Sequence, residues 1–201
     1  MKTFRNVLLA SALIATCASA QTQMVRGDID GIRGTNRFRL DCTNIELVSA
    51  TVNLQQLHDL SRQRDIEFEM QVRNVSAGGR TVLDVVSATQ IPEMFDMGNV
   101  RLGRSDTWEA FYTPGSAVGM FVTAEALTSY GPLGAAGTWL LGPTFLPIAF
   151  GTTNFAGRFQ IDFQPPNNPS FIGANLTAQA LILDPNNVLV ITNPDCKDVR
   201  N

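Results

Sequence analysis

The fold is decided first by one strand pattern, Ile66-Glu67-Phe68-Glu69-Met70-Gln71-Val72, in which apolar and polar residues alternate. Successive side chains of a β-strand point to opposite faces, so this stretch predicts one buried and one solvated face. The same alternation in Arg37-Phe38-Arg39-Leu40-Asp41-Cys42 sends Cys42 to the buried face, together with Phe38 and Leu40. The chain is therefore expected to be built from half-buried strands.

A small barrel is predicted for residues 21–90. The segment Asn53–Ser61 carries leucines at helical spacing and Asn53 is a suitable N-cap, so one short helix is expected between strands. Short strands with one inserted helix resemble the five-stranded OB barrel in order and length, since a helix commonly separates its third and fourth strands. The alternative for this part is a small open sandwich.

A connector is predicted at residues 91–98, because Pro92 and Gly98 bracket this stretch and it lacks strand alternation. Residues 99–201 are predicted to form a β-sandwich, since about seven short strands follow, separated by turns rich in Gly, Pro and Asn. The strand candidates are Asn99–Tyr112, Ala117–Thr123, Gly137–Leu141, Leu146–Thr152, Gly157–Phe163, Asn175–Leu183 and Val188–Thr192. The predicted fold class is thus all-β, with a small OB-like barrel followed by a β-sandwich, in two domains.

The C-terminal part also carries local motifs. They are Gly137-Thr138-Trp139-Leu140-Leu141, the turn Gly151–Arg158, Pro166-Asn167-Asn168-Pro169, and Gln179–Pro185 followed by Thr192-Asn193. On these motifs the segment Gly137–Asn193 resembles the terminal β-sandwich module of secreted bacterial proteins of unknown function. The resemblance implies an accessory or structural module placed at the cell surface, and it carries over no catalytic residue.

The N-terminus has the three parts of a secretory signal peptide. Lys2 and Arg5 form a basic start, Val7–Ala15 is an apolar run, and Ala18-Ser19-Ala20 is a cleavage site of small residues. The signal peptide is therefore predicted to span residues 1–20. The mature protein is expected to begin at Gln21 and to be secreted or periplasmic.

Charge and hydropathy restrict the partners. Removal of the signal peptide takes Lys2 and Arg5 from the 15 basic residues and none from the 18 acidic ones, which lowers the net charge from −3 to −5. A negative protein is disfavoured as a partner of nucleic acids and anionic membranes. The uncharged stretch Ala126–Gly157 is interrupted repeatedly by prolines and glycines, so buried strands and no membrane span are predicted there.

A disulfide is predicted between Cys42 and Cys196. Cleavage removes Cys17, and the two remaining cysteines form an even set in an oxidising compartment, where a disulfide can persist. Two buried free thiols are the alternative. A lipid anchor on Cys17 is disfavoured because Thr16 is bulkier than the residue that usually precedes a lipidated cysteine.

No catalytic or cofactor site is predicted, and the protein is not expected to be an enzyme. His58 is the only histidine and the chain has no Gly-x-Ser-x-Gly motif, so a hydrolytic triad is not indicated. Two cysteines and one histidine do not supply the usual zinc ligands. Glu67 and Glu69 share a strand face that is predicted to be solvated, so with Glu93 they are interpreted as surface residues and not as a glycosidase pair.

Two weaker patterns concern ions. Asp28-Ile29-Asp30-Gly31 begins like a calcium loop, but Arg39 stands where an EF-hand has its bidentate Glu, so an EF-hand is excluded. A looser calcium site is the alternative to an edge strand with outward carboxylates, and no metal ion is predicted. Arg33, Arg37 and Arg39 could bind a single nucleic-acid strand on an OB face, but alternation puts Phe38 on the opposite face, so solubilising arginines are the favoured interpretation.

Aromatic side chains could stack on a sugar ring. The candidates are Trp108, Tyr112, Tyr130 and Trp139. Most aromatic residues of a β domain belong to the core, and Trp108 is the best surface candidate because its neighbours are polar. Trp108 is accordingly the one predicted ligand-binding residue.

The predicted function is that of a secreted, non-enzymatic structural or binding module, with a glycan or a cell-surface protein as its partner. One alternative is a hydrolase with an unrecognised site. The other is a subunit of an extracellular surface assembly, which an exposed apolar patch or an open sheet edge would favour.

Overall fold

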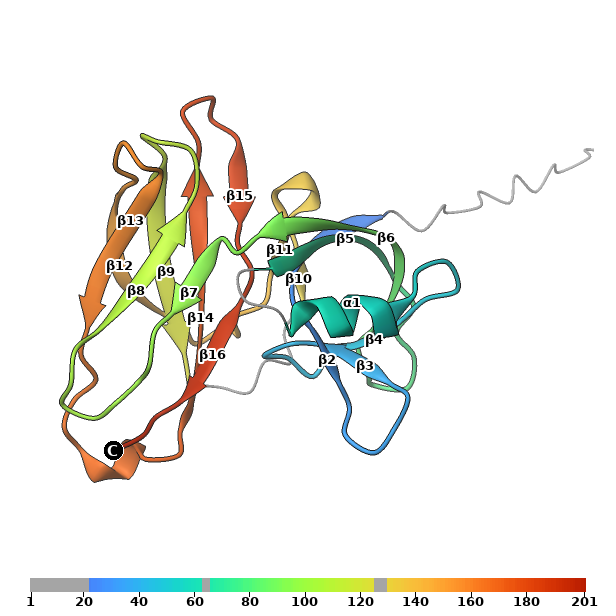
Figure 1. Ribbon diagram of the computed structural model, residues 1–201, viewed down its shortest axis with the longest axis horizontal. Coiled ribbons are helices and arrows are strands. Elements are labelled where there is room, and N and C mark those ends of the chain that lie inside the picture. Colours follow the sequence, from blue (N-terminus) through green and yellow to red (C-terminus); the bar gives the residue numbers. More distant parts are fainter. Residues whose placement is uncertain (1–21, 63–65, 125–129) are drawn as a thin grey trace, which may run out of the picture.

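The computed structural model describes residues 22–62, 66–124 and 130–201. Strands dominate these residues, and the buried apolar side chains form two clusters, one in the N-terminal part and one in the C-terminal part. Figure 1 shows the two parts next to each other, the N-terminal sheet on the right and the sandwich on the left. The all-β prediction is confirmed. The predicted signal peptide and the start at Gln21 lie outside the described residues.

The N-terminal part is one curved six-stranded sheet with a helix. Its elements are β1 (Gln23–Gly27), β2 (Ile29–Gly31), β3 (Phe38–Leu40), β4 (Glu46–Val48), α1 (Leu54–Ser61), β5 (Ile66–Asn74) and β6 (Val82–Pro92). The strand order is β1-β5-β6-β4-β3-β2, with β4 and β6 parallel and the other pairs antiparallel. Short strands with one inserted helix are therefore present as predicted, with the helix between the fourth and fifth strands.

The predicted closure into a barrel is wrong. No sheet of the described residues closes on itself, and the N-terminal sheet has β1 and β2 as its two edges. These edges are adjoining segments of one stretch of chain, since Asp28 alone separates them. The two edge strands are therefore consecutive in sequence, and the sheet curves around the N-terminal core but stays open.

Helix α1 forms where the leucine spacing predicted it. The Asn53 side chain accepts a hydrogen bond from the backbone N–H of Gln56 at 3.1 Å, as an N-cap does. Leu54 is buried in the N-terminal core, and Leu57 and Leu60 pack against that core. The helix therefore covers the core with its apolar face.

The C-terminal part is a sandwich of two sheets, as predicted. The first sheet has the order β12-β9-β14-β15, with β16 pairing β14, and the second has the order β13-β8-β7. The elements are β7 (Phe95–Met97), β8 (Asp106–Phe111), β9 (Ala117–Thr123), β12 (Leu146–Thr152), β13 (Arg158–Phe163), η2 (Pro169–Phe171), β14 (Asn175–Leu183), β15 (Leu189–Ile191) and β16 (Asp195–Asp198). Met97, Trp108, Met120 and Ile182 are among the buried side chains between the sheets.

The predicted division at residues 91–98 differs from the observed elements. Ile91 and Pro92 end β6, and β7 begins at Phe95, so Glu93 and Met94 alone join the two strands. The three residues of β7 do alternate, with Phe95 and Met97 buried and Asp96 half-buried between them, but three residues are too few for the pattern to mark a strand in the sequence. Whether the two parts are independent domains stays a prediction.

A segment late in the sequence returns to the N-terminal core. It contains β10 (Gly131–Pro132), η1 (Gly134–Ala136) and β11 (Thr138–Trp139), and Leu140 and Leu141 after it are buried in the N-terminal cluster. The fully buried Gln179 of β14 holds this segment, because its side chain accepts from the Leu140 backbone N–H at 3.0 Å and donates to the Thr138 carbonyl at 3.0 Å. The N-terminal core therefore includes residues that the sequence assigned to the sandwich.

Arg26 of β1 connects the N-terminal sheet to η1 and to β15. Its guanidinium donates to the backbone carbonyls of Ala136 at 2.8 Å and Ile191 at 2.9 Å, and it pairs with Glu69 of β5 at 2.6 Å. Arg26 is buried, so these charge-assisted bonds fix the contact between the N-terminal sheet and β15.

None of the helices among the described residues is long and apolar enough to span a membrane.

Candidate functional site

A polar groove of about 430 Å³ lies on the N-terminal sheet. Its lining residues are Ile32, Arg37, Arg39, Asn44, Ile45, Glu46, Gly79, Arg80 and Thr81. They belong to the strands β3 and β4 and to the β2–β3, β3–β4 and β5–β6 connections. We call it the arginine groove, after Arg37, Arg39 and Arg80.

Local turn chemistry shapes the two loops at the groove. In the β2–β3 connection the Thr35 hydroxyl donates to the Ile32 carbonyl at 2.7 Å and accepts from the Arg37 backbone N–H at 3.1 Å. In the β5–β6 connection Gly78 and Gly79 both have positive φ, at 65° and 79°, which a side chain would disfavour. These turns place Arg37 and Arg80 on the same side of the sheet.

Two of the three arginines are paired and one has no ion-pair partner. Arg37 binds Glu46 through two hydrogen bonds, and Arg39 binds Asp30 at 2.6 Å. The hydrogen bonds between Arg37 and Glu46 raise the pKa of the Arg37 guanidinium and lower the pKa of the Glu46 carboxyl. The positive charge of Arg80 also lowers the pKa of Glu46. Within the described ranges no carboxylate lies in ion-pair distance of Arg80, which is exposed.

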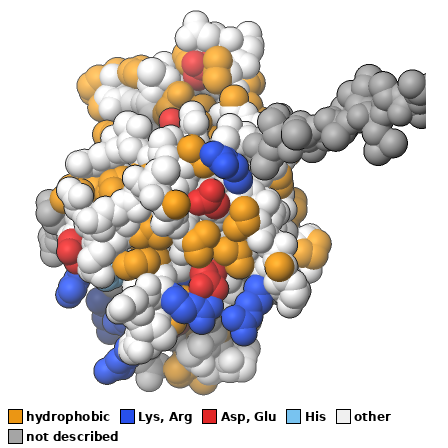
Figure 2. Space-filling model, turned by 90° about the vertical axis from the view of Figure 1, so that its right-hand side faces the viewer, with side chains coloured by type: hydrophobic (Ala, Val, Ile, Leu, Met, Phe, Trp, Pro, Cys, Tyr) orange, Lys and Arg blue, Asp and Glu red, His pale blue; other side chains and the backbone are white. Residues whose placement is uncertain are grey.

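The surface view agrees with this charge distribution. Figure 2 shows the side of the molecule formed by the N-terminal part, with Lys and Arg side chains gathered toward its lower half next to acidic ones. The sequence placed Arg37 and Arg39 on the outward face and Phe38 inward, and the partly buried Phe38 does pack against the N-terminal core. It missed Arg80, because the parallel pairing of β4 with β6 brings residues 79–81 beside Glu46.

Trp108 is not a surface residue, and its predicted stacking role is wrong. Its side chain is 0% exposed, and its ring lies 4.2 Å from the Phe163 ring and 6.5 Å from the Phe95 ring, measured between centroids. Trp108 and Ala110 occupy the inward positions of β8, while the intervening positions of the strand point outward. The adjacent polar residues Thr107 and Glu109 therefore lie on the other face of the strand.

His58 is held by the backbone. Its Nδ1 lies 2.8 Å from the carbonyl oxygen of Ile29, and its ring centroid is 6.1 Å from that of Phe38. These contacts anchor α1 to β2 and β3. They give the half-buried ring a structural role in the contact between helix and sheet.

A group of buried carboxyls lies where the N-terminal sheet meets β16. Glu67 is 4% exposed, which corrects its prediction as a surface residue, and the acidic groups that act on its carboxyl come from both parts of the chain. Burial, together with the charges of Asp28, Glu93, Asp195 and Asp41, raises the pKa of Glu67 well above its usual value. Burial likewise raises the pKa of Asp28 to about 7, helped by Asp41 and Asp195.

These raised pKa values predict a pH-dependent stability. A carboxyl whose pKa is raised by folding binds its proton more tightly in the native state than in the unfolded state. For Asp28, this contribution to the free energy of unfolding is present below pH 3.8 and is lost as the pH rises toward 7. The variant Asp28→Asn should therefore show a smaller loss of unfolding free energy between pH 5 and pH 7.5 than the parent protein. Denaturant titrations in EDTA measure this, with the exposed Asp59→Asn as control. Equal losses in the parent and Asp28→Asn would contradict the prediction.

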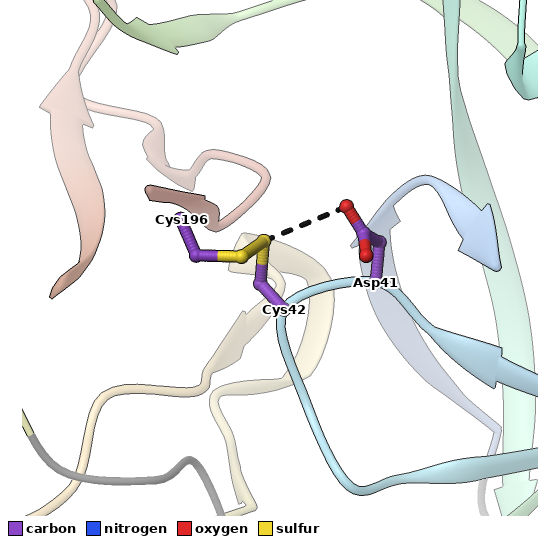
Figure 3. Close-up of side chains that lie close together, drawn as sticks. All are labelled: Asp41, Cys42 and Cys196. Atoms are coloured by element: carbon purple, nitrogen blue, oxygen red, sulfur yellow. Dashed lines mark hydrogen bonds between the residues drawn. A yellow bond between two sulfur atoms is a disulfide. The ribbon is translucent and has the colours of Figure 1, made fainter. Parts of the chain in front are cut away.

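The predicted disulfide is confirmed. Cys42 and Cys196 are bonded, with their Cα atoms 5.5 Å apart and a sequence separation of 154. Cys42 is half-buried in the turn after β3, with φ at 60°, so it does not sit on the strand as predicted. Figure 3 shows the bond joining this turn to β16, with Asp41 beside it. Both sulfurs are used in the bond, so this group with Asp41 offers no thiolate to a metal.

The outer face of the five-stranded sheet carries exposed apolar side chains. We call this the apolar face and define it by Phe121, Phe150, Leu181, Leu183 and Leu189. Phe150 is 71% exposed and lies over Gly119, where a Cβ atom would come within 2.9 Å of its ring. The rings of Phe121 and Phe150 meet edge to face at 84°, so they form no flat platform for a sugar ring.

Comparisons with known proteins define no family. No protein-family model matches the chain, and no curated protein matches it. A solved structure that it resembles is an AA10 lytic polysaccharide monooxygenase (LPMO) from Streptomyces lividans, with 13% sequence identity and a TM-score of 0.27. The match covers 52% of this chain and 60% of that chain. At this TM-score the likeness carries no argument.

Proposed function

We propose that the protein is a secreted, non-enzymatic binding module that holds an acidic glycan in the arginine groove. The observation that carries the proposal is the gathering of Arg37, Arg39 and Arg80 around one concave surface, with Arg80 left without an ion-pair partner among the described residues. Guanidinium groups bind carboxylates and sulfates through paired hydrogen bonds. An acidic sugar unit therefore complements the groove.

The groove also suits the hydroxyl groups of a sugar. Asn44 supplies an amide with donors and acceptors, and Glu46 supplies acceptor oxygens, both at the lining of the groove. A volume of about 430 Å³ lies within the range of small-ligand sites.

Removal of Arg80 should weaken binding selectively. A charge-assisted hydrogen bond contributes about 1.5–3 kcal/mol, so Arg80→Ala is expected to lower the affinity for a uronic-acid oligosaccharide at least tenfold. Arg104→Ala, an exposed arginine of the sandwich, should leave the affinity unchanged. A glycan array of the mature protein, followed by calorimetric titration with oligogalacturonate, measures both variants. A neutral oligosaccharide and a single-stranded oligonucleotide of equal length serve as comparison ligands.

The outcomes separate the alternatives. Equal affinity of the parent and Arg80→Ala for every acidic glycan on the array would contradict the proposal. Tighter binding of the oligonucleotide than of the acidic sugar would assign the groove to nucleic acid. A turnover of any glycan, lost in a folded His58→Ala or Glu67→Gln variant, would favour the hydrolase alternative.

A second candidate function is docking of a protein in an extracellular assembly, and the apolar face favours it. The residues that line this face carry no polar side chain, so it matches an apolar protein surface better than a sugar. Phe150→Ser distinguishes the two functions in the same titrations. It should leave glycan affinity unchanged if the arginine groove is the glycan site, because Phe150 is not among the groove residues.

A further inference from the structure

Three carboxylates from different elements meet beside the disulfide-bearing strand. They belong to Glu93 after β6, Asp96 of β7 and Asp195 of β16, and one oxygen of each lies within 4.8 Å of the others. Ca²⁺ binds oxygen ligands at 2.3–2.6 Å, so two ligands of one ion can lie up to about 5 Å apart. One calcium ion can therefore contact all three carboxylates without a rearrangement of the backbone.

Asp195 is held rigidly at this point. Its carboxylate accepts hydrogen bonds from the backbone N–H groups of Met97 and Cys196, each at 2.7 Å. The Lys197 ammonium lies 2.9 Å from the same carboxylate, and the charges of Asp195, Asp96 and Glu93 all act on it. The Lys197 side chain is 41% exposed, so it can turn into solvent when another cation takes its place.

A second observation points to a missing positive charge. Glu67 is 4% exposed, its Oε2 atom has no hydrogen-bond partner among the described residues, and Glu93 and Asp195 are among the acidic groups that act on its carboxyl. The charged groups around it also include Asp28 and Asp41. A buried carboxyl without a partner is costly unless a cation or a proton compensates it.

We propose that Glu93, Asp96 and Asp195 bind a calcium ion, with Lys197 as the cation that the ion displaces, and that the charge of the ion also compensates the buried Glu67 carboxyl. The site joins the end of β6 to β7 and β16, at the junction between the N-terminal sheet and the sandwich. Calcium therefore stabilises the contact between the two parts. Extracellular modules commonly bind calcium with dissociation constants of about 10⁻⁴–10⁻³ M, a range that suits a protein with an expected secretory signal.

Thermal unfolding of the mature protein tests the site. Addition of 5 mM CaCl₂ to protein freed of metal with EDTA should raise the melting temperature by about 5 °C, because the ion binds the native state alone. Asp96→Asn should abolish the rise, and the exposed Asp59→Asn should retain it. Lys197→Met should increase the calcium affinity severalfold in a calorimetric titration, since it removes the competing cation. This last variant keeps all carboxylates and tests the site even if Asp96→Asn unfolds.

Three results would overturn the proposal. One is a melting temperature that does not change with up to 10 mM CaCl₂ in the parent protein. Another is an equal rise with MgCl₂ in the parent and in Asp96→Asn, which would mark a general ionic effect. The third is unchanged or weaker calcium affinity in Lys197→Met.

Discussion

Reduction of the Cys42–Cys196 disulfide is expected to lower the free energy of unfolding by about 5 kcal/mol. The bond closes a loop of 154 residues, and in the chain-entropy model a loop of this length restricts the unfolded chain by that amount. It also fixes the turn after β3 to β16, which joins the two parts of the molecule. Denaturant titrations with and without a reducing agent measure the loss.

The variant with both Cys42→Ser and Cys196→Ser provides the control for this experiment. It should match the reduced parent protein in stability and should no longer respond to the reducing agent. A loss of less than about 1 kcal/mol on reduction would contradict the account, because the unfolded chain would then gain little freedom.

Truncation of Trp108 is expected to have the next largest effect. Trp108→Ala removes a fully buried indole from between the two sheets and should lower the free energy of unfolding by about 3–5 kcal/mol. Phe155→Ala provides the control, since this ring is 94% exposed and its loss should change stability by less than about 0.5 kcal/mol. Equal effects of the two variants would show that Trp108 does not fill the core.

The glycan affinity of the folded Trp108→Ala protein separates the core role from the stacking role. Trp108 is not among the residues that line the arginine groove. The affinity should therefore equal that of the parent. A selective loss of glycan binding without a loss of stability would restore the stacking role predicted from sequence.

The strands with strict alternation were predictable because each carries its own burial pattern. Phe68 and Met70 are buried as the 66–72 pattern predicts, and Leu40 is buried as predicted from 37–42. The helix was predictable from its leucine spacing and from Asn53. The disulfide followed from the number of cysteines and from the expected compartment, and needed no knowledge of the fold.

Features that depend on contacts between distant segments were not predictable. Glu67 alternates like a solvated residue, but in the folded chain it is buried, with acidic groups from distant segments such as Asp195 acting on it. Arg80 looks like an ordinary loop residue until the parallel pairing of β4 with β6 brings it to Glu46. Trp108 has polar neighbours in sequence, but its environment is set by Phe95 and Phe163 on the adjacent strands.

The candidate sites share this origin. The arginine groove combines residues from three connections and two strands, and the three carboxylates at Asp195 come from β7, β16 and the connection after β6. No single stretch of sequence holds enough of either set to form a motif. The chemistry of each site therefore becomes visible only when the strand order is known.

Amide chemical shifts recorded by NMR during titration with oligogalacturonate test the central claim most directly. The account predicts saturable shifts at Asn44, Glu46 and Arg80, and none at the apolar face around Phe150 and Leu183. Two results would contradict the assignment of glycan binding to the arginine groove. One is a set of shifts confined to the apolar face. The other is an absence of shifts with millimolar oligogalacturonate, together with binding of another class of glycan at the apolar face.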